Sequence, residues 1–199
     1  MNVTVVYESM FGNTRRVAEG VAQGMRDRLG RGRGEIVLRS VQDVSLADMV
    51  EADLLVIGAP THVNALPAPH SRAEASRWVA QDWLGLELEA SALGDGVAEW
   101  LDRLELLPSS SGLFAAFDTR ADLPGPYSGF ASHEISERLR ATGRREAVEP
   151  ESFLVTTTSQ SEPRELERAV AWGHSAAIAS AALLRSTEAD DVAEGERVG

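Results

Sequence analysis

Short runs of apolar and β-branched residues alternate along this chain with longer stretches in which apolar residues recur every three or four positions. The short runs predict buried strands, and the longer stretches predict amphipathic helices. Strands are predicted over residues 3–7, 36–40, 53–60, 112–118 and 152–157. Helices are predicted over residues 14–29, 45–50, 97–107, 131–143 and 166–184. This alternation predicts an α/β fold with a doubly wound, five-stranded parallel sheet that has helices on both faces.

Two stretches do not follow this alternation. Residues 71–84 are compatible with a helix or with a long surface excursion. Residues 186–199 are acidic and hold few bulky apolar side chains, so we expect a disordered tail there. The sequence therefore predicts one folded domain over residues 1–185, followed by this tail. In the last helix, we expect small residues such as Gly173 and Ala176 to allow a close approach to the sheet.

Charge and composition narrow the kinds of partner. The formal net charge of −12 would repel the phosphates of nucleic acid and would attract an electropositive protein. The chain has no cysteine, which excludes disulfides and thiolate metal sites, and its four histidines have no paired spacing that would predict a metal site. No apolar run approaches the roughly 20 residues of a membrane span, and no secretory signal is visible, so we expect a cytoplasmic protein.

The corner between the first strand and the first helix, "SMFGNT" at residues 9–14, is rich in small and polar residues. In an open parallel sheet, ligands bind beyond the carboxyl ends of the strands, and a helix N-terminus there favours an anion. Ser9 and Thr14 add hydroxyl groups, and Gly12 removes a Cβ where the backbone turns tightly. One interpretation is a phosphate site without a lysine, which would not be a Walker-type loop. The other is that Ser9, Asn13 and Thr14 only cap the helix.

The same residues resemble the FMN phosphate loop of the flavodoxin family, T/S-x-T-G-x-T. Ser9, Gly12 and Thr14 match that pattern, and Phe11 departs from it where flavodoxins often carry a hydroxyl group. The resemblance continues in "DLLVIGAPTH" (53–62), "FAAFDTR" (114–120) and "ERAVAWG" (167–173), which are similar to the family's third strand, fourth strand and last helix. The resemblance implies a flavodoxin-like sheet of order 2-1-3-4-5 with one FMN bound at the point where the strand order reverses.

The resemblance also implies that three loops supply the cofactor-binding residues. These residues are Ser9, Met10, Phe11, Gly12, Asn13 and Thr14 in the first loop, Pro60, Thr61 and His62 in the second, and Asp118, Thr119 and Arg120 in the third. His62 would stack on the flavin ring or polarise it, or would be a solvated loop residue. Asp118 or Thr119 would meet the pyrimidine edge, and Arg120 would approach N1 or the phosphate. Alternatively, Asp118 and Arg120 would form a surface ion pair in a turn. Tyr127 would stack on the ring or lie on the surface.

The expected function is electron transfer by bound FMN, with an electropositive redox partner such as a reductase. The cofactor carries the chemistry, so no catalytic side chain is expected. Two alternatives stay open. The first is a flavin-dependent NAD(P)H:quinone or protoporphyrinogen-type oxidoreductase, in which residues 63–96 form a wall or lid over the substrate. The second is a flavin-free domain of the same fold that acts only through protein contacts.

Overall fold

The computed structural model describes residues 1–30, 32, 34–62, 64–81, 85–109, 111–122, 129–156 and 162–198. Six parallel strands form one sheet: β1 (Val3–Tyr7), β2 (Ile36–Ser40), β3 (Leu54–Pro60), β4 (Leu113–Ala121), β5 (Arg145–Glu146) and β6 (Glu151–Val155). Their order is β2-β1-β3-β4-β5, and β6 also pairs with β4. The predicted order 2-1-3-4-5 is confirmed.

The fifth strand of the sequence prediction is interrupted. Leu113 at the start of β4 pairs with Arg145 of β5, whereas Phe117 further along pairs with Glu151 of β6. Pro150 stands directly before β6 and has no N–H group to donate to a ladder. The edge of the sheet therefore consists of two short strands that follow one another along β4.

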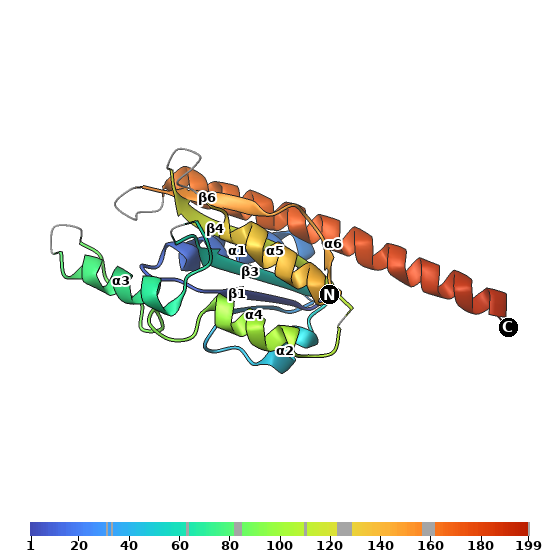
Figure 1. The fold of residues 1–199 in the computed structure, drawn as a ribbon. Helices are drawn as coiled ribbons and strands as arrows, with labels where there is room; N and C mark the ends of the chain where they lie inside the picture. Colours follow the sequence, from blue (N-terminus) through green and yellow to red (C-terminus); the bar gives the residue numbers. More distant parts are fainter. Residues whose placement is uncertain are drawn as a thin grey trace.

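Helices lie on both sides of this sheet (Figure 1). They are α1 (Asn13–Leu29), α2 (Leu46–Val50), α3 (Pro69–Val79), α4 (Val97–Glu105), α5 (Ala131–Ala141) and α6 (Pro163–Val198). Alternate residues of each strand point to opposite faces. In β4, Ala115 and Phe117 belong to the core under α1 and α6, while Phe114 and Ala116 belong to the core under α4 and α5. This alternation decides which side chains at the end of each strand can meet.

Helix α3 resolves the ambiguity at residues 71–84, because residues 69–79 are helical. Pro69 occupies the start of the helix, a position where its missing N–H group is not needed. The helix lies in the connection between β3 and α4 and projects beside the ends of the strands (Figure 1).

The small residues of α6 produce a close approach to α1, where the prediction had expected an approach to the sheet. A Cβ at Gly24 of α1 would lie 1.9 Å from the carbonyl oxygen of Val170. A Cβ at Gly173 of α6 would lie 2.2 Å from the carbonyl oxygen of Val21. The two backbones are therefore in direct contact, and only glycine fits at either position.

Helix α6 continues through residues 186–198, where the sequence analysis expects a disordered tail. These residues contain no proline and several alanine and glutamate residues, which favour a helix. Extending an existing helix also avoids the cost of starting a new one. In Figure 1 this red end of α6 extends away from the sheet. Within the described residues, every helix is too short or too polar to cross a bilayer.

Candidate functional site

Three of the predicted site residues meet at the carboxyl edge of the sheet. Thr119 lies two positions after Phe117 in β4 and therefore faces α1. Its hydroxyl oxygen lies 2.8 Å from that of Thr14, in the first turn of α1, and both side chains are buried. The N–H group of Thr61 donates to the carbonyl oxygen of Thr119 over 2.8 Å. The loops after β1 and β3 and the last residues of β4 thus converge where the strand order reverses, between β1 and β3.

The first loop is a tight, buried turn. Gly12 is the N-cap residue of α1 and has a φ of 85°, a conformation that favours glycine. Its N–H group donates to the hydroxyl of Ser9 over 3.1 Å, and no side chain caps the helix at this position. Ser9 and Thr14 point inward, with 3% and 1% of their surface exposed. Neither Asn13 nor Thr14 is the N-cap, as one interpretation expected, whereas Ser9 does bond the N-cap residue Gly12.

A hollow of about 440 Å³ lies beside this loop. It is lined by Phe11, Gly12, Asn13, Arg15, Arg16, Gly85, Leu86, Glu87, Leu88 and Glu89. The backbone N–H of Glu89 donates to the carbonyl oxygen of Met10 over 2.9 Å, and its carboxylate accepts from Arg15 Nε over 2.7 Å. Arg15 and Glu89 are absent from the predicted site. Arg15 follows the motif directly, whereas Glu89 lies in a stretch without any periodic signal.

His62 contacts helix α3. Its Nδ1 lies 3.1 Å from the hydroxyl of Ser71, in the first turn of α3. Burial, with a smaller effect from the Arg72 charge, lowers the pKa of His62 to about 4. The imidazole is therefore neutral at pH 7, and the His62 side chain is partly exposed. The neighbouring Thr61 accepts, through its hydroxyl, a hydrogen bond of 3.1 Å from the N–H of Ala131.

Asp118 and Arg120 face α5, on the other side of β4 from Thr119. Asp118 is fully buried, and its Oδ2 accepts from the N–H of Ser132 over 3.0 Å and from its hydroxyl over 2.6 Å. Burial raises the pKa of Asp118, and the hydrogen bonds from Ser132 oppose that shift. The guanidinium of Arg120 lies 5.0 Å from the centre of the Phe130 ring. A surface Asp–Arg pair is therefore wrong for this turn.

The remaining predicted positions frame the same edge. Met10 is buried against Ala75 of α3, and Phe11 stacks on Trp78 with ring centres 6.3 Å apart. Pro60 is the last residue of β3 and pairs in register with Thr119. Tyr127 lies outside the described residues.

A buried charge cluster, which no pattern in the sequence predicts, fixes the segment after β3 to this edge. Arg72 of α3 and Glu8, directly after β1, are 3% and 4% exposed. Arg72 Nη1 donates to Glu8 Oε1 over 3.2 Å, and its Nη2 donates to Glu99 of α4. Glu8 Oε2 also accepts from the N–H of Val97 over 2.7 Å. Burial raises the pKa of Glu8, and the bond from Val97 and the Arg72 charge oppose that shift.

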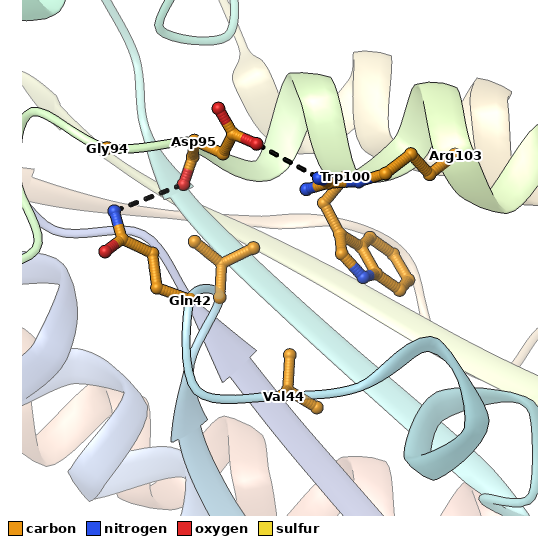
Figure 2. A pocket seen from close by; sticks show the side chains of 7 residues that line it. Gln42, Val44, Gly94, Asp95, Trp100 and Arg103 are labelled. Atoms are coloured by element: carbon orange, nitrogen blue, oxygen red, sulfur yellow. Dashed lines mark hydrogen bonds and ion pairs between the residues drawn. The ribbon is translucent and has the colours of Figure 1, made fainter.

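A second hollow, of about 470 Å³, lies at the end of β2 and contains none of the predicted site residues (Figure 2). It is lined by Val41, Gln42, Val44, Gly94, Asp95, Trp100 and Arg103. In Figure 2, Gln42 reaches the backbone of Asp95, and the Asp95 carboxylate pairs with Arg103. Gln42 Nε2 also donates to the carbonyl oxygen of Ser91 over 2.6 Å. Residues 85–95 are therefore fastened to the ends of both β1 and β2.

The described part of the chain contains no group of three His, Asp or Glu side chains that could hold a metal ion. The arrangement offers hydroxyls, a helix N-terminus and arginines at one sheet edge. These groups suit an anionic ligand with a polar chain.

No family model matches this sequence. Over 62 residues the chain is 38% identical to a flavodoxin of Aquifex aeolicus (strain VF5), and this match covers 31% of the chain and 32% of that protein. Among solved structures, a flavodoxin from the domain Archaea matches with a TM-score of 0.60 at 19% identity, covering 90% of this chain and 99% of that one. Flavodoxin 1 from Bacillus cereus matches with a TM-score of 0.60 at 18% identity, covering 88% and 97%.

Proposed function

We infer that this chain, which has the flavodoxin-like fold, binds one FMN where the loops after β1 and β3 meet the end of β4, and that it acts in electron transfer. The observation that carries this proposal is the contact between Thr14 and Thr119 beside the left-handed turn at Gly12. This contact joins the loop after β1, which resembles a phosphate loop, to the end of β4. Both lie near the point where the strand order reverses. Bound FMN supplies one- and two-electron redox chemistry, and the chain supplies its binding and electrostatic surroundings.

The residues of the first loop fit a phosphate group. Gly12 keeps the turn free of a Cβ, and α1 starts there without a side-chain cap, so the positive end of its dipole faces the adjoining hollow. The hydroxyl of Thr14 can both donate and accept, so it can serve a ligand oxygen as well as Thr119. Arg15 and Arg16 line the same hollow and are its cationic groups, beside the carboxylate residues Glu87 and Glu89. In this proposal Ser9 supports the turn by accepting from Gly12.

The other two loops would shape the site around the ring. Thr61 is held by two hydrogen bonds, to Thr119 and to the N-terminus of α5, so its position is rigid. His62 is neutral at pH 7 and would leave the charge of a nearby flavin unchanged. Arg120 carries a permanent positive charge on the α5 side of the sheet, which would favour a reduced, anionic ring at short range.

An electropositive redox protein is the partner we propose. The net charge of −12 accelerates encounters with such a protein and repels free anionic dinucleotides. A cytoplasmic location is part of this proposal, and the cysteine-free sequence is compatible with it.

One observation favours a second candidate, the flavin-free interaction domain. The Glu89 carboxylate lies over the turn at Gly12, where it would oppose a phosphate. FMN binding distinguishes the two candidates, since the electron carrier binds FMN and the interaction domain does not.

Cofactor analysis of the purified protein tests the proposal. Heat should release a yellow compound that chromatography identifies as FMN, and the apoprotein should quench FMN fluorescence on titration. A colourless protein that does not bind added FMN would refute the proposal and favour the interaction domain. Fast NADPH oxidation in the presence of a quinone, without any reductase, would favour an oxidoreductase over a carrier.

A further inference from the structure

The proposed phosphate loop has no lysine, because the chain contains none, but an arginine stands directly beside it. Arg15 lies in the first turn of α1 and lines the hollow next to Gly12. Its Nε donates to Glu89 over 2.7 Å, and its Nη1 donates to Glu19 over 3.0 Å. The Arg15 side chain is 40% exposed, whereas that of Glu89 is 18% exposed. Arg15 is thus held at the opening of the loop by a mostly buried carboxylate.

The Glu89 carboxylate lies where an anionic ligand of this loop would bind. A Cβ at Gly12 would lie 3.1 Å from Glu89 Oε1 and 3.5 Å from Arg15 Nη2. Gly12 is the N-cap of α1, and no side chain caps the helix there. The amide groups and the dipole at that end of a helix favour a negative charge. Glu89 therefore places a negative charge of the protein itself at the N-terminus of α1, where an anion is favoured.

The position of Glu89 is fixed by the backbone, but its side chain has room to turn. The N–H group of Glu89 donates to the carbonyl oxygen of Met10 over 2.9 Å, and residues 91–95 are tied to Gln42. Glu89 is one of the residues that line the hollow of about 440 Å³, so its side chain is not enclosed by packing on every side. A change of side-chain rotamer would move the carboxylate off Gly12 and release Arg15 without moving the backbone.

We propose that Glu89 and Arg15 together set the affinity of this site for the phosphate of FMN. Glu89 competes with the phosphate for the first turn of α1, and Arg15 becomes the cationic partner of the phosphate when Glu89 turns away. Two N–H groups of a guanidinium match two oxygens of a phosphate, so arginine suits this exchange of one anion for another. The inference rests on the proposed function, because it assumes that the site receives a phosphorylated flavin.

Titration with two flavins isolates the phosphate. FMN and riboflavin share the ring and the ribityl chain, but riboflavin lacks the phosphate. We expect Glu89→Gln to bind FMN at least about fivefold more tightly than the wild type, since a like charge near 4 Å lowers affinity about that much even in water. Its affinity for riboflavin should not change.

Two further variants separate the roles. Adding Arg15→Gln to Glu89→Gln should weaken FMN binding at least about fivefold relative to Glu89→Gln alone, because the cation itself is then missing. Glu19→Gln is the matched control, since it removes the other carboxylate partner of Arg15 but leaves Glu89 in place. It should change FMN affinity by less than about twofold, as expected for an exposed pair. Circular dichroism checks that each variant is folded.

A readout without flavin uses inorganic phosphate. Phosphate that binds only the folded state raises the midpoint of thermal unfolding, and this rise should be larger for Glu89→Gln than for the wild type. Unchanged FMN affinity in Glu89→Gln, or an equal gain for riboflavin, would overturn the inference while leaving the proposed function intact. If neither the wild type nor Glu89→Gln bound FMN, the proposed function would fail. If phosphate also raised the unfolding midpoint of the two proteins equally, this inference would be overturned as well. FMN binding by Glu89→Gln alone would support it.

Discussion

Replacing Arg72 by methionine removes the positive charge from a buried cluster at the edge of the site. The Arg72 side chain is 3% exposed and donates to Glu8, to Glu99 and to the carbonyl oxygen of Pro67. Methionine keeps much of the volume and length of the side chain but cannot donate a hydrogen bond. The variant therefore leaves the Glu8 carboxylate, which is 4% exposed, without its cation.

The expected cost follows from this burial. Removing one partner of a buried ion pair typically destabilises a protein by about 3–5 kcal/mol, because the remaining charge is uncompensated. Glu8 keeps the hydrogen bond of 2.7 Å from the N–H of Val97, and the exposed part of Glu99 can reach water. We therefore expect a loss near the lower end of that range, about 3 kcal/mol.

The pH dependence of this loss gives a specific signature. Burial raises the pKa of Glu8 above its ordinary value of 4.5, so the folded state binds a proton more readily than the unfolded state. Stability therefore falls as the pH rises from 4.5 through the folded pKa, where the buried carboxylate becomes charged. Without Arg72 the folded pKa rises further. The deficit of Arg72→Met should therefore be largest at neutral to alkaline pH and should shrink as the pH falls through the folded pKa.

Urea unfolding followed by far-UV circular dichroism measures this effect, with the free energy of unfolding obtained by linear extrapolation. Adding Glu8→Gln to Arg72→Met should restore part of the loss and reduce its pH dependence, because the most deeply buried carboxylate is then absent and only the partly exposed Glu99 remains. Arg77→Met, at an exposed position of the same helix, is the matched control and should be nearly neutral. A loss below about 1 kcal/mol, or one that is constant with pH, would refute the reasoning about this cluster.

Other predictions concern the packing of α1, the threonine pair and the buried histidine. Gly24→Ala would place a Cβ 1.9 Å from a backbone oxygen and should lower the free energy of unfolding by at least about 2–3 kcal/mol. Gly20→Ala is the control, because its Cβ would lie 3.2 Å from a side-chain methyl group, and it should cost far less. Thr14→Val should weaken FMN binding by about 1–3 kcal/mol in a fluorescence titration, whereas Thr142→Val, which loses a hydroxyl bond of 2.7 Å away from the site, should not. The folded pKa of His62 lies below its ordinary value, so the stability of the wild type should fall as the pH drops from 6.5 to about 4. In urea unfolding, His62→Gln should remove a part of that fall on the order of 2 kcal/mol.

The sheet was predictable because its strands are short, apolar and separated by helical periodicity. Strand order followed from the resemblance, and the structure confirms it. The interruption between β5 and β6 was not predicted, although Pro150 marks it, because a proline can also stand at the start of a continuous edge strand. The extension of α6 was not predicted, because an acidic stretch with few bulky apolar residues favours disorder by composition, whereas here it continues a helix that has already formed.

The backbone of the site was predictable to a similar degree. The period of two along β4 determines that Phe117 and Thr119 face α1, and the position of Thr14 at the start of α1 then brings the two hydroxyls together. The same period sends Asp118 to the opposite face, where it meets Ser132. Asp118, Thr119 and Arg120 were predicted to act together as one loop, but they belong to β4, and its pleat places their side chains on opposite faces.

The charges around the site could not be predicted from local patterns. Glu8 and Arg72 are 64 residues apart, and Arg15 and Glu89 are 74 residues apart. In the sequence each of these residues looks like an ordinary surface charge, because burial of an ion pair depends on two segments meeting in space. Both pairs join the connection between β3 and α4 to the end of β1, one through α3 and one through residues 85–95. The buried Arg72–Glu8 pair contributes to the stability of this edge of the sheet. The Arg15–Glu89 pair places a carboxylate beside the first turn of α1 and so affects the charge at the proposed site. The connection between β3 and α4 therefore influences both properties.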